Sequence, residues 1–172
     1  MNRFPVLILA AAIGGGCALA QSGNPLIAEA KQNYTAIKSN LTKAADKVSE
    51  ADYSFKATPD VRTFGGLIGH IADVQMRMCA AVKGEQKTAN ASSMTAKADL
   101  VAALKASFDE CDAAFDSLTD ANANDRVSMG RGPGRTKLGT LIYATTHDSE
   151  EYGYLAVYMR LKGIVPPSSE GR

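Results

Sequence analysis

The chain has 172 residues, of which 45% are hydrophobic and 22% are charged, so one domain with a real hydrophobic core is expected and intrinsic disorder is disfavoured. Its 19 Lys and Arg residues nearly balance 18 Asp and Glu residues, which leaves no strong basic field of the kind that binds nucleic acid. Two His residues exclude a His-rich metal store but still allow one metal site.

Residues 1–20 have the pattern of a signal peptide. Arg3 precedes an apolar stretch at 6–13, and an A-x-A cleavage motif follows at 18–20. The apolar stretch is too short to span a bilayer of ~30 Å, so no stable membrane insertion is expected. The prediction is an exported protein, periplasmic or secreted, whose domain covers residues 21–172. Removing Arg3 leaves 18 basic residues against 18 acidic ones, so the domain is formally neutral.

The rest of the chain predicts four amphipathic helices. Apolar residues recur every three or four positions over residues 25–48, 61–82, 95–118 and 136–162. Asn24 and Pro25 form a start signal for the first helix, and Gly84 ends the second. Residues 119–135 are rich in Asn, Asp and Gly and predict the longest loop. Because no strand pattern of comparable length competes, we expect an all-α four-helix bundle.

Polar side chains occupy inward positions on two of these helices. His70 lies on the core-facing side of the second helix, and His147 and Glu151 are one turn apart on one face of the fourth. Two imidazoles and one carboxylate are a ligand set that several divalent metals use. The alternative is that both histidines are hydrogen-bonded core residues and that Glu151 faces solvent. Periodicity alone leaves both interpretations open.

Two stretches of the sequence resemble the DinB-like family, part of the DinB/YfiT-like superfamily of metalloenzymes. They are YSFKATPDVRTFGGLIGHIADVQMRMC at residues 53–79 and HDSEEYGYLAVYMRLKGIVPPSS at residues 147–169. The resemblance implies a four-helix bundle that holds a divalent metal, often through one histidine of the second helix and an H-x-x-x-H of the fourth. His70 and His147 match two of these positions, whereas Glu151 replaces the third histidine. A carboxylate at this position favours Zn, Ni, Fe or Mn.

The resemblance also implies a chemistry, although two hypotheses about function remain open. Three protein ligands leave coordination positions free, and members of the family include thiol-dependent transferases and isomerases, in which the metal activates a small thiol. The first hypothesis is a metal-dependent transferase or hydrolase-like enzyme acting on a small-molecule or small-thiol substrate. The second is a non-catalytic bundle with an altered metal site that acts in stress-related binding or at the envelope. Either form could pair as a homodimer through an apolar helix face.

Two aspartates are candidates for supporting such a site. Asp73 follows His70 by three positions and Asp148 follows His147 directly, so either carboxylate could orient water or a ligand imidazole. Acidic side chains on amphipathic helices more often face solvent. The sequence leaves both interpretations open.

Cys79 and Cys111 are the cysteines of the predicted domain. In an oxidising compartment they could form a disulfide between the second and third helices, which would stabilise the fold by roughly 3–4 kcal/mol in the chain-entropy model. The alternative is two buried free thiols that pack as small apolar groups. A disulfide requires Cα atoms within ~7 Å, and the spacing in the sequence does not decide between these alternatives.

Overall fold

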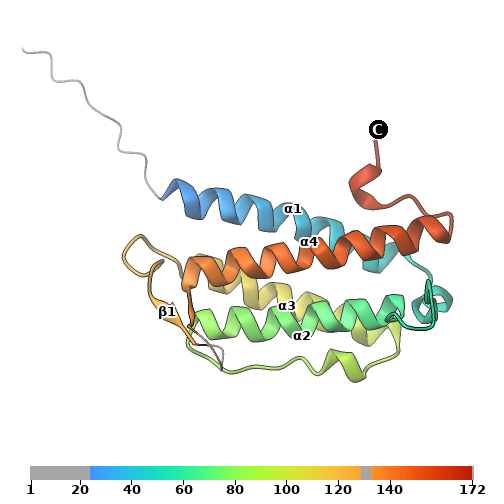
Figure 1. Cartoon of the computed structure of the whole chain (residues 1–172), viewed down its shortest axis with the longest axis horizontal. Coiled ribbons are helices and arrows are strands. Elements are labelled where there is room, and N and C mark those ends of the chain that lie inside the picture. Colours follow the sequence, from blue (N-terminus) through green and yellow to red (C-terminus); the bar gives the residue numbers. More distant parts are fainter. Residues whose placement is uncertain (1–23, 129–132, 172) are drawn as a thin grey trace, which may run out of the picture.

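A computed structural model describes residues 24–128 and 133–171. Its four long helices are α1 (Pro25–Lys47), α2 (Phe64–Val82), α3 (Lys97–Asp116) and α4 (Lys137–Leu161). They lie side by side in a bundle, with α4 in contact with both α1 and α2 (Figure 1). The predicted four-helix bundle is therefore confirmed. The predicted signal peptide at residues 1–20 lies outside the described residues.

Three of the four long helices, α1, α2 and α4, begin at polar side chains that accept hydrogen bonds from the first turn. Asn24 caps α1 as predicted, and Thr63 and Thr136 cap α2 and α4. The prediction placed the start of the second helix at residue 61, which is wrong by three residues, because Thr63 has an extended backbone and its hydroxyl accepts from the N–H of Gly66. Gly84 follows α2 with a φ of 80°, the left-handed conformation that commonly ends a helix.

The long connection between α3 and α4 contains more structure than the predicted loop. Strands β1 (Arg126–Val127) and β2 (Arg135–Thr136) pair antiparallel within it. A Cβ on Gly134 would lie 2.2 Å from the carbonyl oxygen of Val127, so glycine is required for this close approach. Two-residue strands are too short to produce an alternating pattern, which is why the sequence did not reveal them. Residues 129–132 of the same connection lie outside the described residues.

Two short 3₁₀ turns pack against α2. They are η1 (Glu50–Ser54) after α1 and η2 (Ala91–Ser93) before α3. A third, η3 (Pro167–Ser169), lies near the C-terminal end of the chain.

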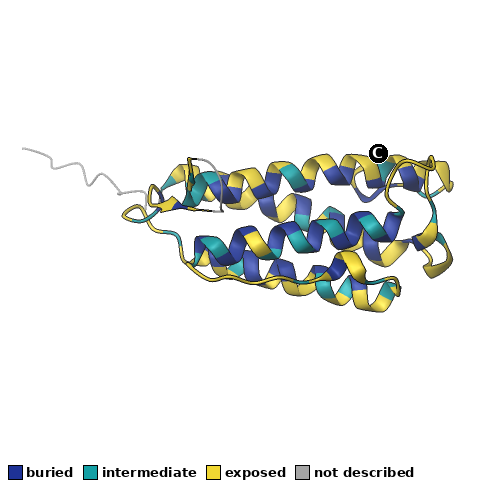
Figure 2. Cartoon of the chain, turned by 60° about the horizontal axis from the view of Figure 1, so that its bottom comes forward, coloured by how far each residue is buried: buried dark blue, intermediate teal, exposed yellow. Residues whose placement is uncertain are grey.

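The core lies along the axis of the bundle. Figure 2 shows buried residues on the inward faces of the helices and exposed residues on the outward faces. Among the side chains that are most completely buried are Leu41, Ile68, Ile71, Leu104, Phe108, Leu141 and Leu155. Burial of such side chains supplies the main driving force for folding, at about 1.5–3 kcal/mol each. None of the described helices is both long enough and apolar enough to cross a membrane.

A disulfide joins α2 to α3 in the structure. It links Cys79 to Cys111, whose Cα atoms are 4.9 Å apart, and both residues are buried. The bridge connects the helix that carries His70 to its most extensively packed neighbour.

Candidate metal centre

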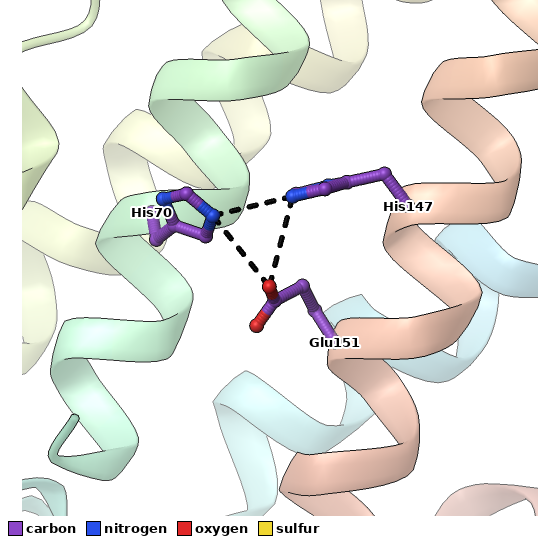
Figure 3. A group of neighbouring side chains, drawn as sticks. All are labelled: His70, His147 and Glu151. Carbon is purple, nitrogen blue, oxygen red and sulfur yellow. Dashed lines mark hydrogen bonds and ion pairs between the residues drawn. The ribbon is translucent and has the colours of Figure 1, made fainter. Parts of the chain in front are cut away.

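Three side chains predicted as metal ligands meet between α2 and α4. His70 extends from α2, and His147 and Glu151 extend from consecutive turns of α4, all toward one point (Figure 3). The two Nε2 atoms are 3.2 Å apart. Oε1 of Glu151 is 3.5 Å from Nε2 of His70 and 3.6 Å from Nε2 of His147. Three donor atoms thus form a nearly equilateral triangle.

This triangle has the dimensions of a metal site. Ligand atoms that lie about 2.1 Å from a tetrahedral ion are about 3.4 Å from one another, and the three measured separations of 3.2, 3.5 and 3.6 Å bracket that value. Two imidazole nitrogens and one carboxylate oxygen are also donors that Zn, Ni, Fe and Mn accept. The residues present therefore fit a divalent transition metal.

The electrostatics of the cluster favour binding of a cation. Glu151 is largely buried, and its Oε2 has no hydrogen-bond partner among the described residues. Burial raises the pKa of Glu151, although the charges of His147 and Arg62 oppose this shift. Burial, assisted by the charge of Arg62, lowers the pKa of His70 and so favours the neutral imidazole. A divalent cation would satisfy both the buried carboxylate and the neutral imidazole.

Asp148 lies in the interior beside His147. Its side chain is 1% exposed, so the alternative that it faces solvent is wrong. Oδ1 of Asp148 is 3.7 Å from Nδ1 of His147, and neither atom has a hydrogen-bond partner among residues 24–128 and 133–171. Burial raises the pKa of Asp148 to about 6. The carboxylate is thus placed behind the imidazole, on the side away from the Nε2 atom that faces the cluster.

Asp73 has a structural role instead. Its carboxylate accepts hydrogen bonds from the backbone N–H groups of Ala91, at 2.7 Å, and Ser92, at 2.9 Å. Burial by itself would raise the pKa of Asp73, but these hydrogen bonds and one from the Ser92 hydroxyl lower it overall. Asp73 therefore fastens the η2 turn to α2 rather than orienting a ligand imidazole.

A hollow of about 660 Å³ opens beside the cluster. Glu151 forms part of its wall, so a molecule in the hollow would contact one of the three donor side chains. The residues around it that bear on recognition are Lys56, Arg62, Leu67, Glu151, Tyr154 and Tyr158. Sequence reasoning missed Lys56, which lies in an irregular segment, and Arg62, which it included in the predicted helix over residues 61–82, whereas α2 begins at Phe64.

Comparisons with known proteins agree with this fold. The sequence profile of one family, described as the DinB superfamily, matches residues 33–155. The structure is similar to a DinB-like protein from Bacillus cereus, with a TM-score of 0.68 and 19% identity over 82% of this chain and 95% of that one. It is also similar to a DinB-like protein from Bacillus subtilis, with a TM-score of 0.62 and 20% identity over 81% of this chain and 92% of that one. No curated protein sequence matches the chain.

Proposed function

The chain belongs to the DinB superfamily, and we propose that it is a metalloprotein that binds one divalent transition metal through His70, His147 and Glu151. The observation that carries this proposal is the triangle of donor atoms between α2 and α4, with sides of 3.2, 3.5 and 3.6 Å. No side chain would have to leave its helix face to bind the ion. The ion is Zn, Ni, Fe or Mn.

The three protein donors leave coordination positions for a further ligand, as in catalytic rather than structural sites. A bound divalent ion supplies Lewis acidity, which lowers the pKa of a coordinated water or thiol. Oδ1 of Asp148 lies 3.7 Å from Nδ1 of His147, and a negative charge there would favour a proton on Nδ1, which leaves the lone pair of Nε2 for the ion. The hollow beside Glu151 gives a small molecule access to the same point. We therefore propose thiol-dependent transferase or isomerase chemistry on a small substrate.

Export is part of the same proposal. Residues 1–20 have the features of a signal peptide, and a disulfide between Cys79 and Cys111 suits an oxidising compartment. Mass spectrometry of the protein purified from its own envelope fraction is expected to find an N-terminus at Gln21. A mature chain that still begins at Met1 would contradict export.

A homodimer also remains a prediction. Exposed apolar side chains of α4, namely Ile142, Val157 and Leu161, supply a surface that a second copy could cover. Light scattering of the purified protein tests this association.

Metal analysis tests the central proposal. The domain, purified without chelator and reconstituted, is expected to hold about one equivalent of a transition metal. H70A and H147A should each reduce this content to below about a tenth of an equivalent, because two donors do not retain an ion that three bind. Glu150 is the matched control for Glu151, since it is adjacent and exposed. E151A is expected to lose metal, whereas E150A keeps it.

The same measurements can reject the proposal. A correctly folded wild-type protein without metal after reconstitution would favour the alternative, a non-catalytic bundle with an altered site. Equal metal content in wild type, H70A and H147A would show that the ligands lie elsewhere. For the chemistry, consumption of a small thiol with an electrophile such as 1-chloro-2,4-dinitrobenzene should be faster with metal-loaded wild type than with H147A. Equal rates would remove the enzymatic part of the proposal.

A further inference from the structure

The hollow beside Glu151 carries basic side chains that the metal cluster does not use. Lys56 and Arg62 contribute two positive charges to its lining, and Asp60 and Glu151 contribute two negative charges. A divalent ion bound at the cluster would add two positive charges to this balance and leave the hollow with a net charge of +2. A ligand with a negative charge would then be attracted to it.

The two basic side chains are available to a ligand. None of the ion pairs among residues 24–128 and 133–171 involves Lys56 or Arg62. Nζ of Lys56 makes one long contact of 3.4 Å to the carbonyl oxygen of Pro59. Arg62 and Glu151 both line the hollow. An anion on Arg62 would thus lie close to the cluster.

The rest of the hollow is suited to the carbon skeleton of a small organic molecule. Leu67 and Tyr158 are buried side chains that form its inner wall, and Tyr154 stands half exposed at its edge. The hydroxyl of Tyr158 donates to the backbone carbonyl of Arg62 at 2.9 Å, which fastens α4 to the segment that carries the guanidinium. Arg62 is therefore attached at its backbone, while its side chain remains exposed to the hollow.

From this arrangement we infer that the site takes a small organic carboxylate, whose anionic end binds Arg62 and Lys56 and whose reacting end faces the cluster beside Glu151. The inference rests on the proposed metal site and names the substrate class for it. The planar guanidinium can donate two parallel hydrogen bonds to a carboxylate, which a neutral or cationic ligand of the same length cannot accept in that form.

A charge series of thiols tests the inference by binding rather than by turnover. The probes are 3-mercaptopropionate, 2-mercaptoethanol and cysteamine, which present a carboxylate, a hydroxyl and an ammonium group on the same two-carbon chain. Each is titrated into the protein loaded with Co²⁺, and binding is measured from the cobalt–thiolate absorption. The anionic thiol is expected to bind at least about tenfold more tightly than the neutral one, and cysteamine the most weakly.

Two variants connect this preference to the residues. R62A is expected to reduce the preference for the anion to about threefold or less, and K56A to reduce it by a smaller factor. R160A is the matched control, because it also removes one arginine charge while its guanidinium bonds to Ser169 outside the hollow. It should keep the wild-type preference. Thermal melts of each variant check that the fold is retained.

The outcomes separate this inference from the proposal on which it rests. If Co²⁺ does not bind, the metal proposal and the inference both fall before any thiol is added. If Co²⁺ binds but the three thiols bind equally, only the inference falls. A preference for the anion that survives in the R62A/K56A double variant would also overturn it, since the carboxylate would then be held elsewhere.

Discussion

Replacing Gly69 with alanine is expected to loosen the contact between α2 and the η2 turn, one residue before His70. A Cβ on Gly69 would lie 2.6 Å from the carbonyl oxygen and 2.9 Å from the carbonyl carbon of Ala91. Ordinary contacts begin at 3.4 Å, so the turn would have to move by about 0.8 Å (3.4 minus 2.6). That movement would strain the backbone hydrogen bonds that Asp73 accepts from η2.

The size of the effect follows from two opposing terms. Overpacking of this kind costs about 1–3 kcal/mol, and the better helix propensity of alanine returns about 0.5–1 kcal/mol. Gly153 is the matched control, because it is also helical but a Cβ there would meet nothing within 4 Å. G153A should raise the free energy of unfolding by about 0.5–1 kcal/mol. The propensity gain is common to both variants, so they should differ by the overpacking cost of about 1–3 kcal/mol. At 2–4 °C per kcal/mol, their melting temperatures should differ by roughly 2–12 °C.

Urea unfolding and thermal melts of the wild type, G69A and G153A measure this difference directly. Metal titration of the same proteins shows whether strain at position 69 reaches the neighbouring ligand His70. Equal stability of G69A and G153A would refute the reasoning, because it would mean that η2 can pack against α2 even when residue 69 has a Cβ.

Three further predictions concern the disulfide, the η2 turn and Glu151, the third proposed metal ligand. Denaturing alkylation without reductant should modify neither Cys79 nor Cys111, and replacing both by alanine should lower the free energy of unfolding by roughly 3–4 kcal/mol; modification of both thiols would exclude the bridge. The pKa of Asp73 lies below its usual value of 3.8, so the deprotonated carboxylate stabilises the fold above about pH 4 and this contribution is lost as the pH falls through the lowered pKa. The difference in unfolding free energy between wild type and D73A should therefore be about 1–2 kcal/mol at pH 6 and shrink below pH 4, and a difference independent of pH would contradict this. E151H should keep or tighten metal binding and shift the preference from Mn toward Zn in competition titrations, because imidazole is a softer donor than carboxylate; loss of binding would show that the site requires the carboxylate.

The helices and the side chains that form the cluster could be predicted because their signals are local. Asn24 caps α1 through a side chain two residues from its partner, and His147 and Glu151 lie on one face because an α-helix repeats every 3.6 residues. His70 is far from these two residues in the chain, but the apolar period of each helix indicates its inward face. The period of α2 therefore placed His70 on the side that faces the core.

The tertiary structure decided what depends on contacts between elements. Asp73 and Asp148 each follow a histidine of the cluster by one to three residues, yet Asp73 fastens the η2 turn and Asp148 lies buried behind His147. An irregular segment has no repeating pattern that shows where its side chains point. Only the packed structure therefore shows that Lys56 and Arg62 lie at the hollow beside Glu151. The sequence by itself determined which three side chains form the candidate metal cluster and which four helix faces bury the core. Packing determined the distances within that cluster and its surroundings, because those depend on how the helices approach one another.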